Sequence, residues 1–342
     1  MIKNYDSIDL LKFIASIFVV ALHADAFYDI SPTLNVFICS GIARLAVPIF
    51  FVVSSFFFFS KEVTWQSTKK YCRRLLTLYI AWFIVSLPKT IFDRFASSEY
   101  SIRETVFRFI RSFFFTSTFS GSWFIVSCIF CALIYYQLEK LQKIKRILIT
   151  VIISVAAYSW CVFTSGYGKL LEPLGLSEGY RIYSLLFGNP YCSIIVGIPY
   201  FAVGRYFAKK YVPGRVPIKN AILSVVCVSV LLTEAYLTNM YNLAATTDCY
   251  VMLLPSVICL FPVFLSWSVK LNCAKTLRVA STIIFFSQFI LLYICELSEW
   301  VLKVTIPCFG KFAFTVLCGL LLTWIILKLK DKRGFRWLRY FY

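Results

Sequence analysis

A polar stripe in the first apolar segment contains the residues best suited to chemistry. Ten residues separate Lys12 from His23. On an α-helix this step places both side chains within about 20° of one face and about 16 Å apart along the axis. Asp9 and Ser16 fall on the same face. Histidine is the natural general base near neutral pH, so the stripe predicts a polar cavity lined by His23 rather than a lipid-facing surface.

Further polar residues are expected at a similar depth in other apolar segments, namely Arg44, Glu234, Ser122 and Trp123. A hydroxyl attacks an acyl carbonyl slowly without a base, and the developing oxyanion needs a donor. His23 with Arg44 would supply both. The alternative is that these residues only pair inside a helix bundle, as buried charges must. For Glu234 this structural role is favoured.

A second polar group is expected at the cytoplasmic ends of the helices. It comprises Lys12, Arg73, Arg74, Arg205 and Arg278. Arginine is the residue best suited to phosphate recognition, although cytoplasmic arginine is also common as a topology signal.

The elements that position these residues are long apolar helices. The 342 residues are 60% hydrophobic and 15% charged, which excludes a soluble fold, a disordered chain and a small secreted disulfide scaffold. Ten stretches approach the roughly 20 residues needed to cross a hydrocarbon core. They lie at 8–28, 36–59, 75–92, 113–138, 147–164, 191–207, 221–238, 250–268, 281–297 and 309–327. The sequence therefore predicts an all-α polytopic membrane protein.

The distribution of basic residues gives the orientation. Both tails and alternate loops hold 23 Lys and Arg residues, and the other loops hold 7. This bias is the positive-inside rule with both termini cytoplasmic. The net charge of +19 is thus interpreted as topology, and no nucleic-acid partner is expected. With no linker or soluble segment visible, residues 1–342 are predicted to form one membrane domain.

The thirteen cysteines do not form a metal-site pattern. Cys128 and Cys131 have no second pair, and the chain has one histidine. No metal is expected, and the cysteines are interpreted as small packing residues. A disulfide between Cys249 and Cys308, which are expected near the outer surface, stays open.

Two segments resemble the acyltransferase 3 family of integral-membrane acyltransferases. The first is Asp9-Leu10-Leu11-Lys12-Phe13-Ile14-Ala15 followed by Val19-Val20-Ala21-Leu22-His23, and the second is Arg44-Leu45-Ala46-Val47-Pro48-Ile49-Phe50-Phe51-Val52-Val53-Ser54. Weaker similarities follow at Trp123-Phe124, Phe201-Ala202-Val203-Gly204-Arg205 and Ser281-Thr282-Ile283-Ile284-Phe285-Phe286-Ser287-Gln288.

The resemblance implies acyl transfer, commonly from cytoplasmic acetyl-CoA to a hydroxyl of a surface glycan or glycolipid at a bacterial cytoplasmic membrane. His23 would match the essential histidine, Lys12 its basic partner and Arg44 the arginine of the second motif, with Glu234 as an acceptor or as a group that orients His23. The expected substrate-binding residues are Asp9, Ser122, Trp123 and Gln288. The expected acyl-CoA phosphate ligands are Arg205, Arg73 and Arg74.

The chain departs from the family pattern at three places. Ser54-Ser55 replaces a common Ser-Gly, Phe285 and Gln288 replace a common Tyr and His, and Ser122 replaces a histidine before the tryptophan. Because His23 is the only imidazole, mechanisms that need two histidines are excluded. Gln288 retains the capacity to hydrogen-bond but not to transfer a proton.

Two other classes of protein fit the same inventory. A transporter of an acylated or anionic compound also needs a polar path with intramembrane charges. A membrane sensor or anchoring module is the third reading, because bundles of this kind can be fused to soluble domains. Formation of a new ester would distinguish the acyltransferase from both.

Overall fold

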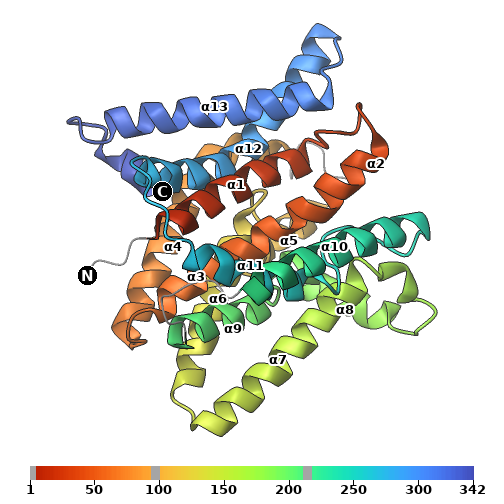
Figure 1. Cartoon of the computed structure of the whole chain (residues 1–342). Helices are drawn as coiled ribbons and strands as arrows, with labels where there is room; N and C mark the ends of the chain where they lie inside the picture. The colour runs from red at the N-terminus through yellow and green to blue at the C-terminus, as the bar shows by residue number, and fades with distance from the viewer. Residues whose placement is uncertain (1–4, 94–100, 211–217) are drawn as a thin grey trace. The chain divides into compact units, whose positions relative to one another are not determined.

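The computed structural model describes residues 5–93, 101–210 and 218–342, and these residues form helices and connecting turns without any strand (Figure 1). The longer helices are α1 (Asp6–His23), α3 (Ala46–Phe59), α4 (Trp65–Ile91), α5 (Ile102–Phe115), α6 (Ser122–Glu139), α7 (Lys143–Thr164), α8 (Ser177–Phe187), α9 (Gly197–Lys210), α10 (Ile218–Met240), α11 (Leu253–Ser266), α12 (Ala274–Leu302) and α13 (Cys308–Leu329). The shorter ones are α2 (Pro32–Asn35), η1 (Val36–Gly41), η2 (Ile42–Leu45), η4 (Gly168–Leu170), η5 (Pro190–Cys192) and η6 (Arg336–Phe341). The predicted all-α class is confirmed.

Seven of the described helices are long and apolar enough to cross a membrane, or eight if the bent pair Ser177–Cys192 and Gly197–Lys210 is one span. Every predicted span overlaps a helix, but α11 is shorter than a full span and α1 carries three charged residues. The protein is therefore a multi-pass membrane protein. The count of ten spans and the location of the termini stay predictions.

The predicted span 113–138 is wrong at its first end. Residues up to Phe115 belong to α5, and α6 begins at Ser122 after Gly121, which has a positive φ of 84°. Glycine adopts this conformation without steric cost, so the chain turns sharply there. The polar residues Thr116-Ser117-Thr118 and Ser120-Gly121-Ser122 mark this break, which the average hydrophobicity of the longer segment did not reveal.

The helices gather into two compact units. Unit 1 contains the described parts of Met1–Phe50, Pro213–Leu237 and Pro255–Tyr342; unit 2 contains those of Phe51–Val212 and Thr238–Leu254.

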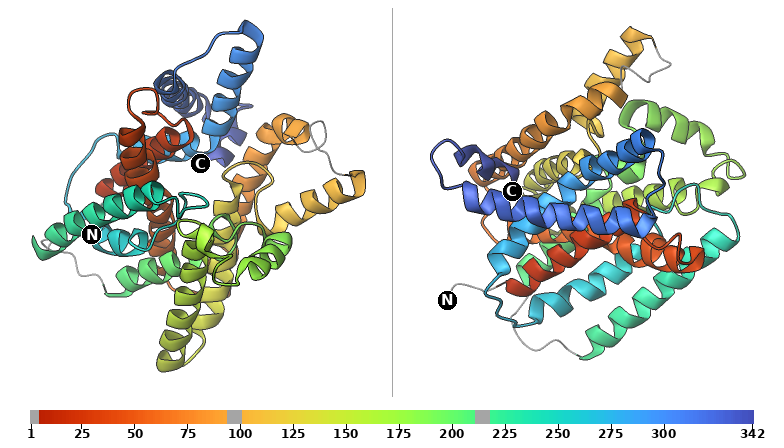
Figure 2. Two further views of the ribbon diagram at one scale, coloured as in Figure 1. Left: turned by 90° about the vertical axis from the view of Figure 1, so that its right-hand side faces the viewer. Right: turned by 90° about the horizontal axis from the view of Figure 1, so that it is seen from above.

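In unit 1, α12 packs against both α1 and α13 (Figure 2). Asp9 meets Arg278 near the starts of α1 and α12, and His23 lies against Phe289 further along both helices, so the two run parallel. The α13 helix runs antiparallel to α12, since Lys311 near its start binds Glu299 near the end of α12, whereas Gly319 further along fits against the earlier Ile284. These directions agree with the alternation predicted for the spans.

The second apolar segment is one continuous helical run from Pro32 to Phe59, but its middle is irregular. A π turn at Val36–Gly41 passes into a 3₁₀ turn at Ile42–Leu45 before α3 begins. Pro48 has no N–H to donate to the carbonyl of Arg44, which favours the tighter turn at this point.

Helices α3 and α9 pack closely against each other in unit 2. The Ser55 hydroxyl donates a 2.7 Å hydrogen bond to the Phe201 carbonyl. A Cβ added to Gly204 would lie 2.6 Å from both Ser55 Cβ and the Val52 carbonyl oxygen. Close approach in this unit is thus provided by Gly204 opposite Ser55.

Candidate active site

The only histidine ends α1 and is accessible. His23 is the last residue of this helix, and its ring lies against Phe289 of α12 with centroids 4.6 Å apart at 58°. The helix continues without a break from Asp6, so the predicted common face of Asp9, Ser16 and His23 is present. An aromatic ring on one side fixes the imidazole plane while the exposed part stays open to a reactant.

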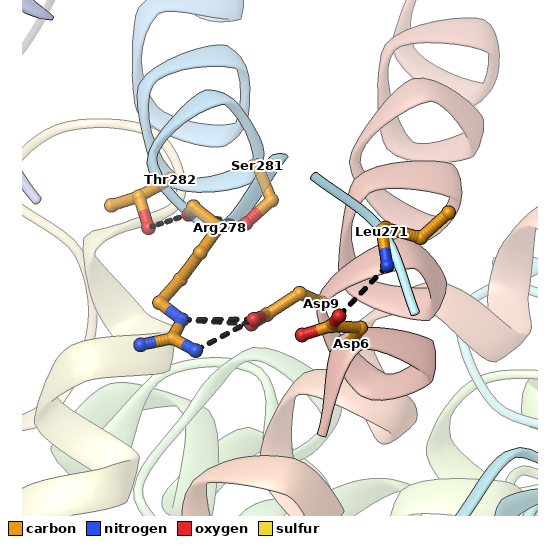
Figure 3. Close-up of polar contacts among 6 residues, drawn as sticks. All are labelled: Asp6, Asp9, Leu271, Arg278, Ser281 and Thr282. Atoms are coloured by element: carbon orange, nitrogen blue, oxygen red, sulfur yellow. Dashed lines mark hydrogen bonds and ion pairs between the residues drawn. The ribbon is translucent and has the colours of Figure 1, made fainter. Parts of the chain in front are cut away.

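The other end of the polar stripe is bound to α12 (Figure 3). Arg278 Nε donates to Asp9 Oδ1 at 2.9 Å, and its terminal nitrogen donates to Oδ2 at 2.7 Å. The nearby Asp6 carboxylate accepts a 2.8 Å hydrogen bond from the Leu271 amide. Asp9, expected to bind substrate, is buried and is engaged in a two-pronged ion pair. Its substrate role stays a prediction, while its contact with α12 is structural.

The turn after His23 is held by a residue that the sequence did not single out. Asn35 is buried; its Nδ2 donates to Asp25 Oδ1 at 3.0 Å, and its Oδ1 accepts from the Phe27 amide at 3.3 Å. Asp25 has a positive φ of 46°, which is uncommon outside glycine. Asn35 therefore fixes the turn directly after the imidazole. An asparagine in a Ser-Pro-Thr-Leu-Asn run carries no signal in the sequence for this contact.

Arg44 lies at the irregular point of the second segment. It is half-buried in the 3₁₀ turn, and this turn packs against α1. Non-α turns within a long helix are frequent at functional sites. The structure thus brings the segment of Arg44 against the helix of His23.

Lys12 is half-buried on α1, less than one turn beyond Asp9. Its place on the stripe follows from the continuous helix.

Glu234 lies on a different flank of α10 from the residue that packs on the π turn. Leu232 covers Gly41, where a Cβ would be 2.5 Å from the leucine Cδ2. Glu234 follows Leu232 by two residues, which corresponds to a rotation of about 200° around the helix axis. Glu234 is therefore on the flank of Cys227, whose sulfur is 3.8 Å from that of Cys259.

Gln288 is fully buried in α12. Its Nε2 donates to the Phe285 carbonyl at 2.8 Å, while its Oε1 accepts no hydrogen bond from any described residue. The Phe285 ring packs edge-on against Phe50, with centroids 5.2 Å apart. A buried acceptor without a donor is costly, so Gln288 has the properties of a ligand-binding group.

Ser122 and Trp123 belong to unit 2. Ser122 is buried at the start of α6, and its hydroxyl accepts a 3.1 Å hydrogen bond from the Thr118 amide. Trp123 lies near Phe51, with ring centroids 6.1 Å apart. This hydrogen bond stabilises the turn before α6, so the Ser122 side chain has a structural role.

The three arginines expected to bind acyl-CoA also lie in unit 2. Arg205 is half-buried and forms an ion pair with Glu139, which also accepts a 3.0 Å hydrogen bond from Arg146. Arg73 and Arg74 are exposed on α4. Arg205 is therefore part of a three-residue ionic cluster, and the other two are accessible to an anion.

The chain matches the family described as "Acyltransferase domain" over residues 5–328, and it belongs to this acyltransferase 3 family. Two curated proteins of Enterococcus faecalis, each named amino-acid racemase, are similar to it. One is 25% identical over 271 residues, covering 78% of this chain and 37% of the relative. The other is 23% identical over 348 aligned positions, covering 96% of this chain and 46% of the relative. The chain thus spans less than half the length of these relatives. No solved structure matches.

Proposed function

We propose that the protein is a membrane acyltransferase that moves an acetyl group from acetyl-CoA to a hydroxyl of a surface or exported glycan. The observation that carries this proposal is the accessible imidazole of His23, seated on Phe289 at the end of a polar helix face. Membership in the acyltransferase 3 family supports the reaction class.

In the proposed reaction His23 accepts the proton of the acceptor hydroxyl as its oxygen attacks the acyl carbonyl. The ester bond forms, the thioester bond breaks, and the proton passes to the departing thiolate. Arg44, on the turn that packs against α1, provides positive charge near the developing oxyanion, and such preorganised charge is often the largest contribution to catalysis. Lys12 is the basic partner further along the same face of α1. Gln288 binds the substrate by its free Oε1.

The test compares ester-linked acetate on purified surface glycans from the wild-type, deletion, His23→Ala and His23→Gln strains, by mass spectrometry and proton NMR. Loss of a general base lowers rates by about 10²–10⁴-fold, so both His23 variants should lose the ester found in the wild type. Tyr28→Phe, at an exposed position five residues further on, is the matched control. Ester retained in both His23 variants would refute the proposed base.

The partial coverage of the relatives supports a second candidate. They are named amino-acid racemase, and more than half of each lies outside the region that matches this chain. In this reading the bundle is the membrane module of a longer protein, which transports or senses a small anionic compound. Proteoliposomes loaded with labelled acetyl-CoA and external glycan distinguish the two, since a transporter moves label without forming an ester.

A further inference from the structure

Two short helices of unit 2, α5 and α8, have their apolar faces directed outward. In a soluble protein the apolar stripe of such a helix faces the core. The inward side of α5 holds the buried Thr105 and Ser112 together with the half-buried Phe109 and Phe113, whose rings pack against Phe83 and Tyr79 of α4. The outward side is apolar as well, as expected of a face that meets something other than water.

The exposed face of α5 is large and contains one charged residue, Arg103, in its first turn. On a helical projection five exposed apolar residues fall within an arc of about 140° that excludes Thr105 and Ser112. They are Ile102, Val106, Phe107, Ile110 and Phe114, each 41% to 67% exposed.

The α8 helix repeats this pattern. Ile182, Leu185 and Leu186 form one side and are 47% to 53% exposed. The inward side carries tyrosines that use their hydroxyl groups. Tyr183 shares a 2.9 Å hydrogen bond with Ser193, and Tyr180 donates to Asn189 at 3.1 Å.

The two helices are fastened to each other at their last turns. Arg111 of α5 donates to the carbonyls of Ser184, at 3.3 Å, and Leu185, both in the last turn of α8. A guanidinium at a helix C-terminus satisfies free carbonyls and complements the helix dipole. Phe115 packs edge-on against Phe187, with centroids 5.5 Å apart. The C-terminal ends of α5 and α8 thus meet within unit 2.

Most charges on this pair of helices are neutralised within it. Glu104 binds Arg108 at 2.8 Å, and Glu178 binds Arg181 at 2.6 Å. Charges that are paired in this way reduce the cost of placing a helix near hydrocarbon.

The lengths and places of α5 and α8 identify what covers them. Fourteen residues of helix extend about 21 Å, which is too short for a hydrocarbon core of about 30 Å. In the sequence α5 lies between the spans α4 and α6, and α8 follows the span α7 and is bent by 41° from α9. Exposed apolar residues also run along α4 to its last turn, which has Ile91 and Phe92 at its end. The apolar face of the pair therefore continues a surface that must face lipid.

We propose that α5 and α8 form one interfacial platform whose outward face, formed by Ile102, Val106, Phe107, Ile110, Phe114, Ile182, Leu185 and Leu186, lies in the phospholipid at the boundary of headgroups and acyl chains. Amphipathic helices that are too short to span the membrane bind in this region through the area of their apolar face. The proposal does not depend on the acyltransferase activity.

The test is site-specific photo-crosslinking of the full chain in phosphatidylethanolamine and phosphatidylglycerol vesicles. p-Benzoylphenylalanine is introduced singly at positions 107, 114 and 186 on the outward faces, and at position 104 on the polar flank as a matched control. After illumination, intact-mass analysis should find phospholipid adducts at the first three positions, at least fivefold above position 104.

Adduct yield at positions 107, 114 and 186 equal to that at position 104 would overturn the proposal. Crosslinks to a second copy of the chain in place of lipid would also overturn it, and would identify a subunit interface. Each variant must elute as a single species before reconstitution. Positions 110 and 185, on the same faces, replace any variant that fails this criterion.

Discussion

The carboxylate of Asp9 binds the side chain of Arg278 through both of its oxygens, and the two residues are 269 positions apart. The pair is asymmetric, since the Asp9 side chain is 3% exposed and that of Arg278 is 57% exposed. Two parallel hydrogen bonds of this kind fix geometry as well as charge. The contact therefore holds α1, the helix that ends in His23, against α12.

The asymmetry of this ion pair predicts unequal effects on stability. Arg278→Gln leaves a buried carboxylate without its cation and should cost about 3 kcal/mol or more. Asp9→Asn leaves a guanidinium that water can reach, and should cost about 1–2 kcal/mol. Thermal unfolding of the purified variants in detergent measures both values.

The double variant Asp9→Asn/Arg278→Gln provides the control for this pair. Its loss should be smaller than the sum of the two single losses, because the first substitution already removes the interaction. Additive losses, or a larger loss for Asp9→Asn than for Arg278→Gln, would contradict the structural role of the pair.

The helices themselves were predictable from the sequence because a membrane requires long apolar runs. The irregular points in their backbones were not predicted. The turn at Gly121 lies in a short polar run between two apolar stretches, and the π and 3₁₀ turns before α3 lie within a segment that is apolar on average. Hydrophobicity averages over such points, whereas backbone conformation depends on single residues.

The polar stripe of α1 was predictable because helical periodicity alone places Asp9, Ser16 and His23 on one face. Its partners were not. Arg278, Phe289 and Asn35 contact this helix and its following turn through tertiary packing. A single sequence contains no information on which distant residues meet, so neither the Asp9–Arg278 pair nor the role of Asn35 was predicted.

Gly204 should tolerate no side chain. In Gly204→Ala the new Cβ would lie 2.6 Å from Ser55 Cβ and from the Val52 carbonyl oxygen. Helices α3 and α9 must then separate, at a cost of about 1–3 kcal/mol. Ser55→Gly in the same chain should restore part of the loss, and only part because the Val52 carbonyl stays in place. Melting temperature in detergent measures the effect.

Gly179→Ala is the matched control for this substitution. A Cβ there would meet only Trp160, at an ordinary 3.8 Å. Alanine is favoured over glycine within a helix by up to about 1 kcal/mol, so stability should stay equal or rise. A Gly204→Ala variant as stable as Gly179→Ala would show that α3 and α9 are less closely packed.

Comparing Arg205 with Arg146 distinguishes a role of Arg205 in binding acyl-CoA from a purely structural role. Both bind Glu139, so Arg205→Ala and Arg146→Ala should lose similar stability. If Arg205 also binds the phosphates of coenzyme A, only Arg205→Ala should raise the KM for acetyl-CoA, by about tenfold for one lost charged contact of about 1.4 kcal/mol. Equal KM values in the two variants would assign Arg205 to structure alone.

Arg73→Ala/Arg74→Ala should raise the KM for acetyl-CoA with little change in melting temperature, because both side chains are exposed on α4. The increase should diminish at high salt, since exposed charges are screened. Steady-state kinetics in proteoliposomes at two salt concentrations measure this dependence. An unchanged KM at low salt would remove both residues from the donor site.

Gln288→Leu should separate binding from folding. The Gln288 Oε1 is buried and accepts no hydrogen bond from any described residue. Gln288→Leu loses the Nε2 hydrogen bond to the Phe285 carbonyl, at about 1 kcal/mol, but also removes the cost of the unsatisfied oxygen, so the melting temperature should change little. If this oxygen accepts a hydrogen bond from the substrate, its loss should reduce kcat/KM about tenfold or more. Ester formation and melting temperature are measured on the same preparation.

The matched control is Thr315→Val on the neighbouring helix. Gly319 of α13 contacts Ile284 of α12. Thr315 lies one turn from Gly319 on α13, and Gln288 lies one turn from Ile284 on α12. The Thr315 hydroxyl is also buried without a hydrogen bond to the described residues. Its loss should leave kcat/KM and melting temperature unchanged, because Thr315, unlike Gln288, is not proposed to contact substrate. Full activity in Gln288→Leu with an unchanged melting temperature would exclude Gln288 from the substrate site.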